Sequence, residues 1–253
     1  MMEQLKDKIA LVTGSSRGIG AAIAKHFAKH GANVVLHGRD EASLGKLEDE
    51  IIRDGGQAMR VIADVTEFAE IESARSEIEK KFGPVDILVA NAGGSFTKPA
   101  PFDELTEVGW HASVEGNLTA TFLTIKSFLP GMKGRKAGNI ITISSAAARH
   151  VTGRSPVPYS AAKAGIEIMT QQLAAEVGPF GIRVNCIAPE MIFTEKHRAM
   201  IPPEHLKGIV EYHPLKRLGE TKDVADAALF LASDNSSWIT GVILDVAGGA
   251  VMV

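Results

Sequence analysis

The chain has 253 residues, of which 45% are hydrophobic and 23% are charged. This composition is ordinary for a globular protein that buries a core without disulfides or metals. The formal net charge of −3 argues against a nucleic-acid partner or an anionic membrane surface. The sequence shows no signal-peptide segment and no run of the about 18 apolar residues that a membrane helix needs. We therefore expect a cytoplasmic protein with no membrane partner.

Short apolar runs rich in Val and Ile alternate with longer segments of helical periodicity. The predicted strands are Ile9–Val12, Val34–His37, Ala58–Ala63, Ile87–Ala90, Asn139–Ser144, Arg183–Ala188 and Val242–Val246. The predicted helices are Gly18–His30, Glu41–Asp54, Glu67–Phe82, Thr106–Leu129, Tyr159–Gly178 and Lys222–Ala232. Near-continuous apolar strands separated by helices are typical of a parallel sheet covered on both faces. Residues 1–253 are thus predicted to form a single α/β domain with a doubly wound, Rossmann-type parallel sheet.

One stretch, residues 190–219, interrupts this alternation. It carries Pro202, Pro203 and Pro214 and is of mixed polarity. A long irregular insertion in a compact domain is usually functional, so we expect a substrate lid near 190–219. A plain surface excursion is the alternative.

A glycine-rich turn joins the first predicted strand to the first predicted helix. It reads Thr13-Gly14-Ser15-Ser16-Arg17-Gly18-Ile19-Gly20. Glycines allow a pyrophosphate to approach the backbone closely, and the helix N-terminus offers free N–H groups to the anion. The strand–turn–helix context makes the glycine spacing a strong signal for a dinucleotide. The predicted cofactor contacts here are Gly14, Ser16, Arg17, Ile19 and Gly20.

With these motifs the chain resembles the short-chain dehydrogenase/reductase family, and the resemblance covers essentially the whole sequence. The motifs that follow in the family's order are Asp64-Val65, Asn91-Ala92-Gly93, Asn117, Ser144-Ser145, Tyr159-x-x-x-Lys163 and Asn185 to Pro189. The resemblance implies that Asp64 and Val65 lie at the adenine end of the cofactor and that Asn91, Ala92 and Gly93 lie against it. By the same resemblance, Pro189, Ile192 and Thr194 are nicotinamide-side contacts. For Asp64 a helix cap ahead of Glu67 is an alternative role.

The end of the second predicted strand bears on the choice of nicotinamide cofactor. Gly38 stands where NAD-preferring relatives place an acid, and Arg39 follows it. A guanidinium pairs well with phosphate, so Arg39 and Arg17 together predict NADP(H). NAD(H) is the less favoured alternative, in which Asp40 binds the ribose; Arg39 and Asp40 could also be solvated loop charges.

Tyr159 and Lys163 are four residues apart on a predicted helix and so project from one face. A tyrosine with its ordinary pKa of about 10 is too weak a base near neutrality. A nearby ammonium and the positive nicotinamide of the oxidised cofactor would lower that pKa. Ser145 is the candidate for polarising the substrate carbonyl, with neighbouring Ser144 as the alternative. The resemblance implies that Asn117 holds a water in a proton relay, although a buried helix Asn can simply bind local backbone groups.

Together these residues predict an NADP(H)-dependent reductase. Hydride would pass directly from the nicotinamide to a ketone, with Tyr159 as the acid, giving a secondary alcohol. No metal is expected, since the histidines and the cysteine lack ligand spacing. A catalytically silent nucleotide-binding regulator or scaffold, an NAD-dependent alcohol dehydrogenase, and an isomerase or epimerase with bound cofactor are alternatives.

The substrate side departs from the family pattern. Glu190 stands where the family usually has a glycine, which alters the backbone freedom beside the nicotinamide. The chain most resembles the 3-oxoacyl-acyl-carrier-protein reductases, but of their two basic surface residues one aligns with Lys136 and the other falls at Phe180. An acyl carrier protein or a small free ketone is therefore the expected partner. Relatives are commonly homotetramers, and we expect one here. Pocket candidates are Gly94–Phe96, Ala146, Arg154–Val157, Glu190, Met191 and Phe193–Met200.

Overall fold

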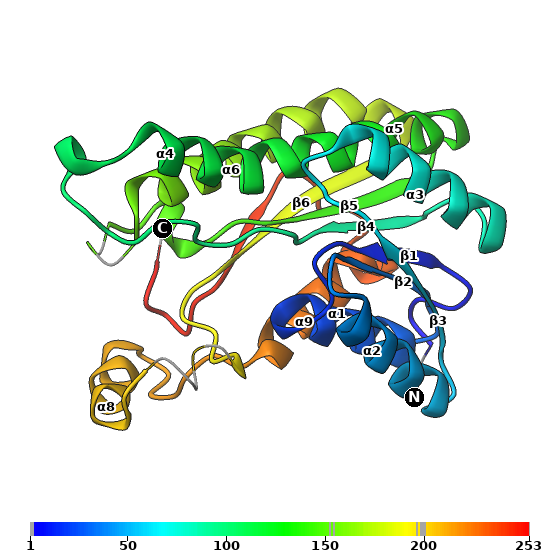
Figure 1. Ribbon diagram of the computed structural model, residues 1–253. Coiled ribbons are helices and arrows are strands. Elements are labelled where there is room, and N and C mark those ends of the chain that lie inside the picture. The colour runs from blue at the N-terminus through cyan, green and yellow to red at the C-terminus, as the bar shows by residue number, and fades with distance from the viewer. Residues whose placement is uncertain (1–2, 152, 154, 196, 198–200, 253) are drawn as a thin grey trace.

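The computed structural model describes residues 3–151, 153, 155–195, 197 and 201–252. In this part of the chain seven parallel strands form one sheet in the order β3-β2-β1-β4-β5-β6-β7 (Figure 1). The strands are β1 (Ile9–Val12), β2 (Asn33–Gly38), β3 (Gln57–Ile62), β4 (Ile87–Ala90), β5 (Gly138–Ile143), β6 (Ile182–Pro189) and β7 (Ile243–Val246). The prediction of a doubly wound, Rossmann-type parallel sheet is confirmed.

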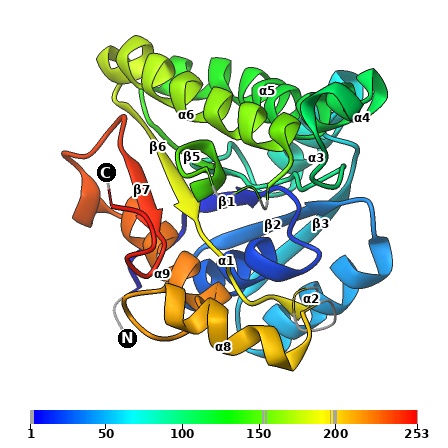
Figure 2. The same cartoon turned by 90° about the vertical axis from the view of Figure 1, so that its left-hand side faces the viewer.

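Helices cover both faces of the sheet, as a parallel sheet requires. The helices α1 (Gly18–Lys29), α2 (Glu41–Arg53) and α9 (Thr221–Ala232) lie on one face (Figures 1 and 2). The other face carries α3 (Phe68–Lys81), α4 (Glu107–Val114), α5 (Ala120–Arg135) and α6 (Val157–Val177). Among the described residues, no helix has the length and apolar character needed to cross a membrane.

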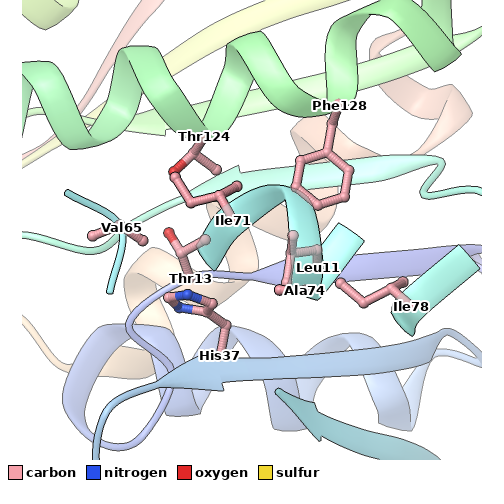
Figure 3. Close-up of a pocket in the computed structure, with 9 residues that line it drawn as sticks. All are labelled: Leu11, Thr13, His37, Val65, Ile71, Ala74, Ile78, Thr124 and Phe128. Atoms are coloured by element: carbon pink, nitrogen blue, oxygen red, sulfur yellow. The ribbon is translucent and has the colours of Figure 1, made fainter. Parts of the chain in front are cut away.

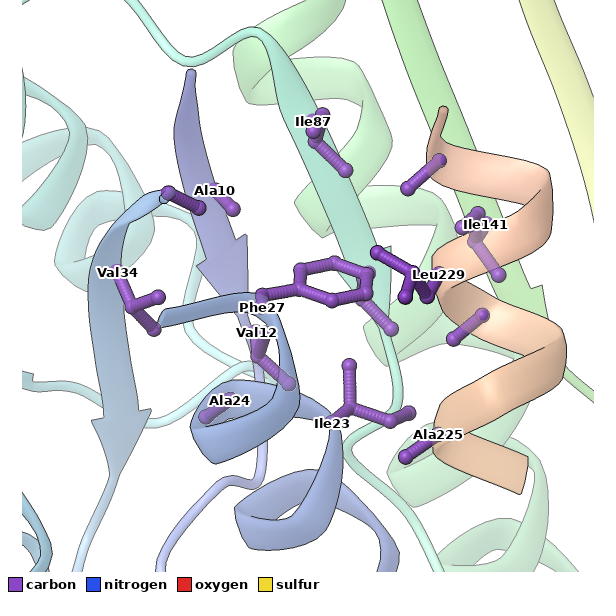
Figure 4. Packing of buried hydrophobic residues seen from close by; sticks show 14 of the residues in the cluster. Ala10, Val12, Ile23, Ala24, Phe27, Val34, Ile87, Ile141, Ala225 and Leu229 are labelled. Carbon is purple, nitrogen blue, oxygen red and sulfur yellow. The ribbon is translucent and has the colours of Figure 1, made fainter. Parts of the chain in front are cut away.

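The alternation of side chains along the strands divides the core into two halves. In β2, Val34 and Leu36 belong to the cluster under α1 and α9, whereas Val35 points to the opposite cluster. Figure 4 shows the first cluster, with Phe27 of α1 packed between the strands and Leu229 of α9. Each large side chain buried in this way contributes about 1.5–3 kcal/mol. The central strands β1 and β4 are buried on both faces, and this is why their sequences are continuous apolar runs.

The predicted helix Thr106–Leu129 differs from the structure. It consists of α4, a π-helical segment (Glu115–Thr119) and α5, and it continues to Arg135 with Pro130 inside it. The prediction ended the helix before Pro130 because proline usually breaks helices. Lys136, with a φ of 53°, ends the helix in the left-handed conformation.

The prediction of an irregular 190–219 segment was also incomplete. It contains a ten-residue helix, α8 (Pro203–Tyr212), which lies apart from the sheet in Figure 1. Pro202 is its N-cap and Pro203 its first helical residue. Proline is favoured at the first position because its fixed φ suits a helix and its missing N–H would be unpaired there. Two of the three prolines that indicated a loop, Pro202 and Pro203, thus mark the start of a helix.

Candidate active site

Predicted site residues follow each of the strands β1 to β6, so they meet at the carboxyl edge of the sheet. This edge holds the switch point between β1 and β4, where the strand order reverses and ligands of such sheets bind. Two features of this edge define a site: a glycine turn at its centre and a Ser–Tyr–Lys group beside it.

The glycine turn is tight and is pinned to β4. Gly14 and Gly18 have φ values of +64° and +60°, and a Cβ on Gly20 would lie 2.4 Å from the carbonyl oxygen of Gly14. Asn91 donates from Nδ2 to Thr13 O at 2.8 Å and to Gly14 O at 3.2 Å. The turn places the N-terminus of α1 at this edge, where its N–H groups would stabilise an anion.

The remaining turn residues lie where the motif predicts. Ser16 lies beside Gly38, whose Cβ, if present, would be 3.8 Å from Cβ of Ser16. Ile19 packs against the core under α1. Ala92 donates its N–H to Thr13 Oγ1 at 3.0 Å, so the start of the Asn91–Gly93 turn is joined to the glycine turn.

Asn117 lies fully buried in the π-helical segment. Its amide accepts from Gly94 N and donates to Gly94 O, both at 3.0 Å, and donates to Ser113 O at 2.8 Å. A Cβ on Gly93, whose φ is +151°, would lie 2.6 Å from Asn117 Oδ1, so only glycine fits. The side chain thus holds the chain after β4 against the π-helical segment, an irregularity that often occurs at functional sites.

Ser145, Tyr159 and Lys163 come together as the spacing predicts. Ser145 follows β5 and is hydrogen-bonded to Tyr159 on α6, and its Oγ also accepts from Ala147 N at 3.2 Å. The Lys163 Nζ lies 5.7 Å from the centre of the Tyr159 ring and donates to Ile143 O at 2.8 Å. Neighbouring Ser144 instead points into the protein, where its hydroxyl lies 3.0 Å from Lys163 O. The structure therefore favours Ser145 over Ser144.

Burial perturbs both titratable groups. It raises the pKa of Tyr159, and the hydrogen bond with Ser145 opposes this shift. It also lowers the pKa of Lys163 to about 8, so the ammonium form still predominates at pH 7. In the protein alone the pKa of Tyr159 is thus raised, not lowered. The lowering expected from the sequence depends on a further positive charge beside the ring.

At the other end of the glycine turn, two arginines and two aspartates lie near each other. Arg39 is largely exposed and its Nη1 is 3.0 Å from Asp64 Oδ2. Asp40 is the N-cap of α2 and accepts from Ser43 N at 3.0 Å. Hydrogen bonds from Ser43 hold the pKa of Asp40 below its usual range, and the charge of Arg17 adds to this effect. The carboxylate of Asp40 is therefore occupied by its helix.

Asp64 closes a local turn and does not cap a helix. Its Oδ1 accepts from Thr66 N at 2.9 Å and from Thr66 Oγ1 at 2.8 Å, and α3 begins only at Phe68 with Glu67 as its N-cap. The backbone hydrogen bond from Thr66 is the largest of the contacts that lower the pKa of Asp64. The alternative role of a helix cap is thus wrong, because the N-cap of α3 is Glu67, three residues after Asp64.

Val65 borders a small cavity with Thr13 and His37 (Figure 3). The cavity has a volume of about 10 Å³, enough for at most one water and too small for a substrate. Neither ring nitrogen of His37 has a hydrogen-bond partner in the described part of the chain. Burial lowers the pKa of His37 to about 4, so this imidazole is neutral at pH 7.

Past the end of β6, the 190–219 segment returns to the glycine turn. Pro189 ends β6, and Ile192 is buried beside Gly219. The methyl group of Thr194 would be 3.6 Å from a Cβ on Gly18. Of the predicted nicotinamide-side residues, Thr194 thus lies next to the start of α1.

Glu190, the departure from the family pattern, is bound to the far end of this segment. Its Oε2 lies 2.5 Å from His213 Nε2, and His213 Nδ1 lies 2.7 Å from Ile209 O. Tyr212 Oη is 2.6 Å from His150 Nε2. Sequence reasoning missed these partners, and the unexpected glutamate was the one signal for them.

The substrate-pocket candidates border the same edge. Ala146 is buried, and the ring of Phe96 lies so close to Gly116 that a Cβ there would be 2.3 Å from its Cζ. Met191 has a φ of +30°. Arg154 and residues 196 and 198–200 lie outside the described residues.

Comparison with known proteins agrees with this geometry. The family model described as enoyl-(acyl carrier protein) reductase matches residues 14–251. The chain is 39% identical to the 3-oxoacyl-[acyl-carrier-protein] reductase FabG of Escherichia coli, over 97% of this chain and 98% of that one. It is 37% identical to the 7alpha-hydroxysteroid dehydrogenase of the same species, over 98% and 96%.

The same holds for solved structures. A 3-oxoacyl-[acyl-carrier protein] reductase from Brucella melitensis with bound NAD matches with a TM-score of 0.92 and 36% identity, over 100% of this chain and 94% of that one. An α/β protein with this sheet, glycine turn and Ser–Tyr–Lys group is of the dinucleotide-binding oxidoreductase class. The chain belongs to the short-chain dehydrogenase/reductase family.

Proposed function

We propose that this protein is an NADP(H)-dependent carbonyl reductase that converts a ketone to a secondary alcohol. The observation that carries the proposal is the Ser145–Tyr159–Lys163 group, which lies at the same edge as the glycine turn. An NAD-dependent alcohol dehydrogenase would use the same group, and the cofactor assay below separates the two.

The residues of the edge fit a dinucleotide. A Cβ on Gly14 would lie 2.9 Å from Ala92 Cα, and one on Gly20 would meet the backbone at 2.4 Å, so the turn has the close backbone packing that a pyrophosphate cradle needs. Gly14, Ser16, Arg17, Ile19 and Gly20 would hold the pyrophosphate. The adenosine side would be held by Arg39, Asp64, Val65, Asn91, Ala92 and Gly93, and the nicotinamide side by Tyr159, Lys163, Pro189, Ile192 and Thr194.

The chemistry follows from three side chains. The bound nicotinamide supplies the hydride. Tyr159 donates its phenolic proton to the carbonyl oxygen, and Ser145 holds and polarises that oxygen. Lys163, mostly cationic at pH 7, stabilises the phenolate left on Tyr159. In this proposal Asn117 holds Gly94 and the chain after β4 in place. It is also the candidate for holding a water in the proton relay.

Two arginines support the preference for NADP(H). Arg39 is exposed at the end of β2, and Arg17 begins α1 without a side-chain cap contact in the described residues. Asp40, the acid that would bind an NAD ribose, is engaged with Ser43. Guanidinium groups at this position match a 2′-phosphate. The Arg39–Asp64 ion pair is exposed and therefore weak, so it can be exchanged for the phosphate.

We propose a 3-oxoacyl group or another small ketone as the substrate. An acyl carrier protein remains an optional partner. Lys136, the one aligned basic residue, ends α5. Phe180 stands where the second basic residue is missing, and Lys133 Nζ lies 5.2 Å from the centre of its ring. The 190–219 segment would act as the lid, since it follows β6 and its Thr194 lies next to Gly18 in the glycine turn.

Assembly and location are further parts of the proposal. Val108, Trp110, Phe122 and Ile168 are exposed on α4, α5 and α6, and an apolar surface of this kind fits a homotetramer. We expect the protein in the cytoplasm. A monomer mass by light scattering would exclude the tetramer.

The test is consumption of NADPH and NADH with an acetoacetyl thioester, a short β-keto ester, an aryl ketone and a keto-sugar. Tyr159→Phe, which keeps the ring and loses the acid, is the matched control. Loss of NADPH absorbance that is absent in the variant supports the proposal. A preference for NADH would refute the arginine argument alone, and binding of NADPH without turnover of any ketone would favour the silent regulator.

A further inference from the structure

A buried carboxylate lies behind the Ser–Tyr–Lys group. Glu167 is on α6, four residues after Lys163, and is 7% exposed. Burial raises its pKa, and hydrogen bonds from Ser144 and the charge of Arg149 act against this rise. Charged side chains are rarely buried unless they are paired, so the partners of Glu167 indicate what it does.

Both partners flank Ser145. Glu167 Oε1 lies 2.9 Å from the Ser144 hydroxyl, and Oε2 lies 3.0 Å from Arg149 Nε. This contact is an ion pair between the guanidinium of Arg149 and the carboxylate of Glu167. Arg149 also donates from Nη2 to Asp245 Oδ1 on β7 at 2.5 Å.

Between Ser145 and Arg149 there are only three alanines, which form a single 3-10 turn. Alanine has no polar side-chain atoms that could anchor this turn. Backbone hydrogen bonds such as Ala148 N to Ser145 O close the turn on itself, but they do not tie it to α6. The contacts of Ser144 and Arg149 with Glu167 do so.

We propose that Glu167 is a positioning residue for the reductase: one carboxylate holds Ser144 and Arg149 and thereby fixes the Ser145 hydroxyl against Tyr159 on the same helix. Asp245 holds the other side of the Arg149 guanidinium. This inference rests on the proposed function. A displacement of about 1 Å in a reacting group can cost about 100-fold in rate, so loss of this carboxylate should act on kcat and leave cofactor binding intact.

The main variant is the double replacement Arg149→Met with Glu167→Leu. Replacing both members of a buried ion pair with apolar residues of similar volume often leaves a protein folded. Glu167→Gln is the second variant and keeps the size of the side chain. Glu176→Gln is the matched control, because Glu176 lies on the same helix and is paired with Lys133 Nζ at 2.6 Å, away from Ser145.

Two measurements test the proposal. In the first, kcat and the KM values for ketone and NADPH are measured with the substrate found above. We expect kcat to fall about 10–100-fold in the double variant and in Glu167→Gln, with the KM for NADPH within twofold and the control unchanged. An unchanged kcat in either folded variant would overturn the proposal.

The second measurement is hydrogen exchange of the amides at 146–149, which needs no substrate. We expect faster exchange there in both variants and unchanged exchange in α6. Unchanged exchange at 146–149 would overturn the proposal even if kcat had fallen. If the wild-type protein turns over no ketone, the proposed function fails, and the exchange result still decides whether Glu167 holds the turn.

Discussion

Because of His37, we expect the free energy of unfolding to decrease at acidic pH by an amount that follows from its pKa. Its side chain is buried beside a cavity of about 10 Å³, with both nitrogens unpaired within the described residues. Burial lowers its pKa from the ordinary 6.5 to about 4. The unfolded chain therefore takes up a proton at a pH where the folded protein does not.

The sign follows from linkage. Below pH 6.5 the unfolded state binds more protons than the folded state. The contribution of neutral His37 to the free energy of unfolding is therefore complete above this pH and decreases as the pH falls toward 4. One pKa unit corresponds to about 1.4 kcal/mol. From these pKa values, moving from pH 7 to pH 5 should cost about 2 kcal/mol through His37 alone.

The perturbation is His37→Leu, which cannot titrate and leaves no unpaired polar atom. Urea unfolding at pH 7 and pH 5 gives the free energy of unfolding for both proteins. Other titrating groups contribute equally to each, so the difference isolates His37. We expect the wild-type protein to lose about 2 kcal/mol more than the variant. Equal losses would refute the argument that this imidazole is buried in its neutral form.

Three further predictions concern the cradle, the lid and the core. In Gly20→Ala the new Cβ would meet Gly14 O at 2.4 Å, so we expect NADPH affinity, measured by fluorescence titration, to fall at least about 10-fold; an unchanged Kd would contradict the close packing of the turn. Glu190→Gln weakens the contact with His213, and we expect unfolding to become easier by about 1–3 kcal/mol with a raised KM for ketone. If neither changes, the contact does not anchor the lid. Phe27→Ala removes a fully buried ring and should cost about 3–5 kcal/mol in urea unfolding, and a loss below 1 kcal/mol would show that the core refills the space.

Predictions that rested on residues close together in the sequence agreed with the structure. β1 and β4 have the predicted bounds, because a strand buried on both faces must be apolar throughout. The Tyr159–Lys163 pair lies on one helix face since a four-residue spacing is one turn. Gly14 and Gly18 have the positive φ values that a tight turn requires.

Predictions failed at prolines and at a helix irregularity. Pro130 lies inside α5, although a proline usually ends a helix. Helix α8 begins at prolines that indicated a loop. The π-helical segment at Asn117 has no clear local signal, and its amide is held by Gly94 from the chain after β4.

The sequence by itself determined the doubly wound sheet and the glycine turn, because each depends on periodicity or short spacing along the chain, and the family resemblance singled out Ser145, Tyr159 and Lys163 as candidates. Only the tertiary structure decided which distant groups support them. Glu190 meets His213, and Glu167 meets both Ser144 and Arg149. A buried charge must find a partner wherever the fold brings one, and sequence distance does not reveal which residues the fold will bring together.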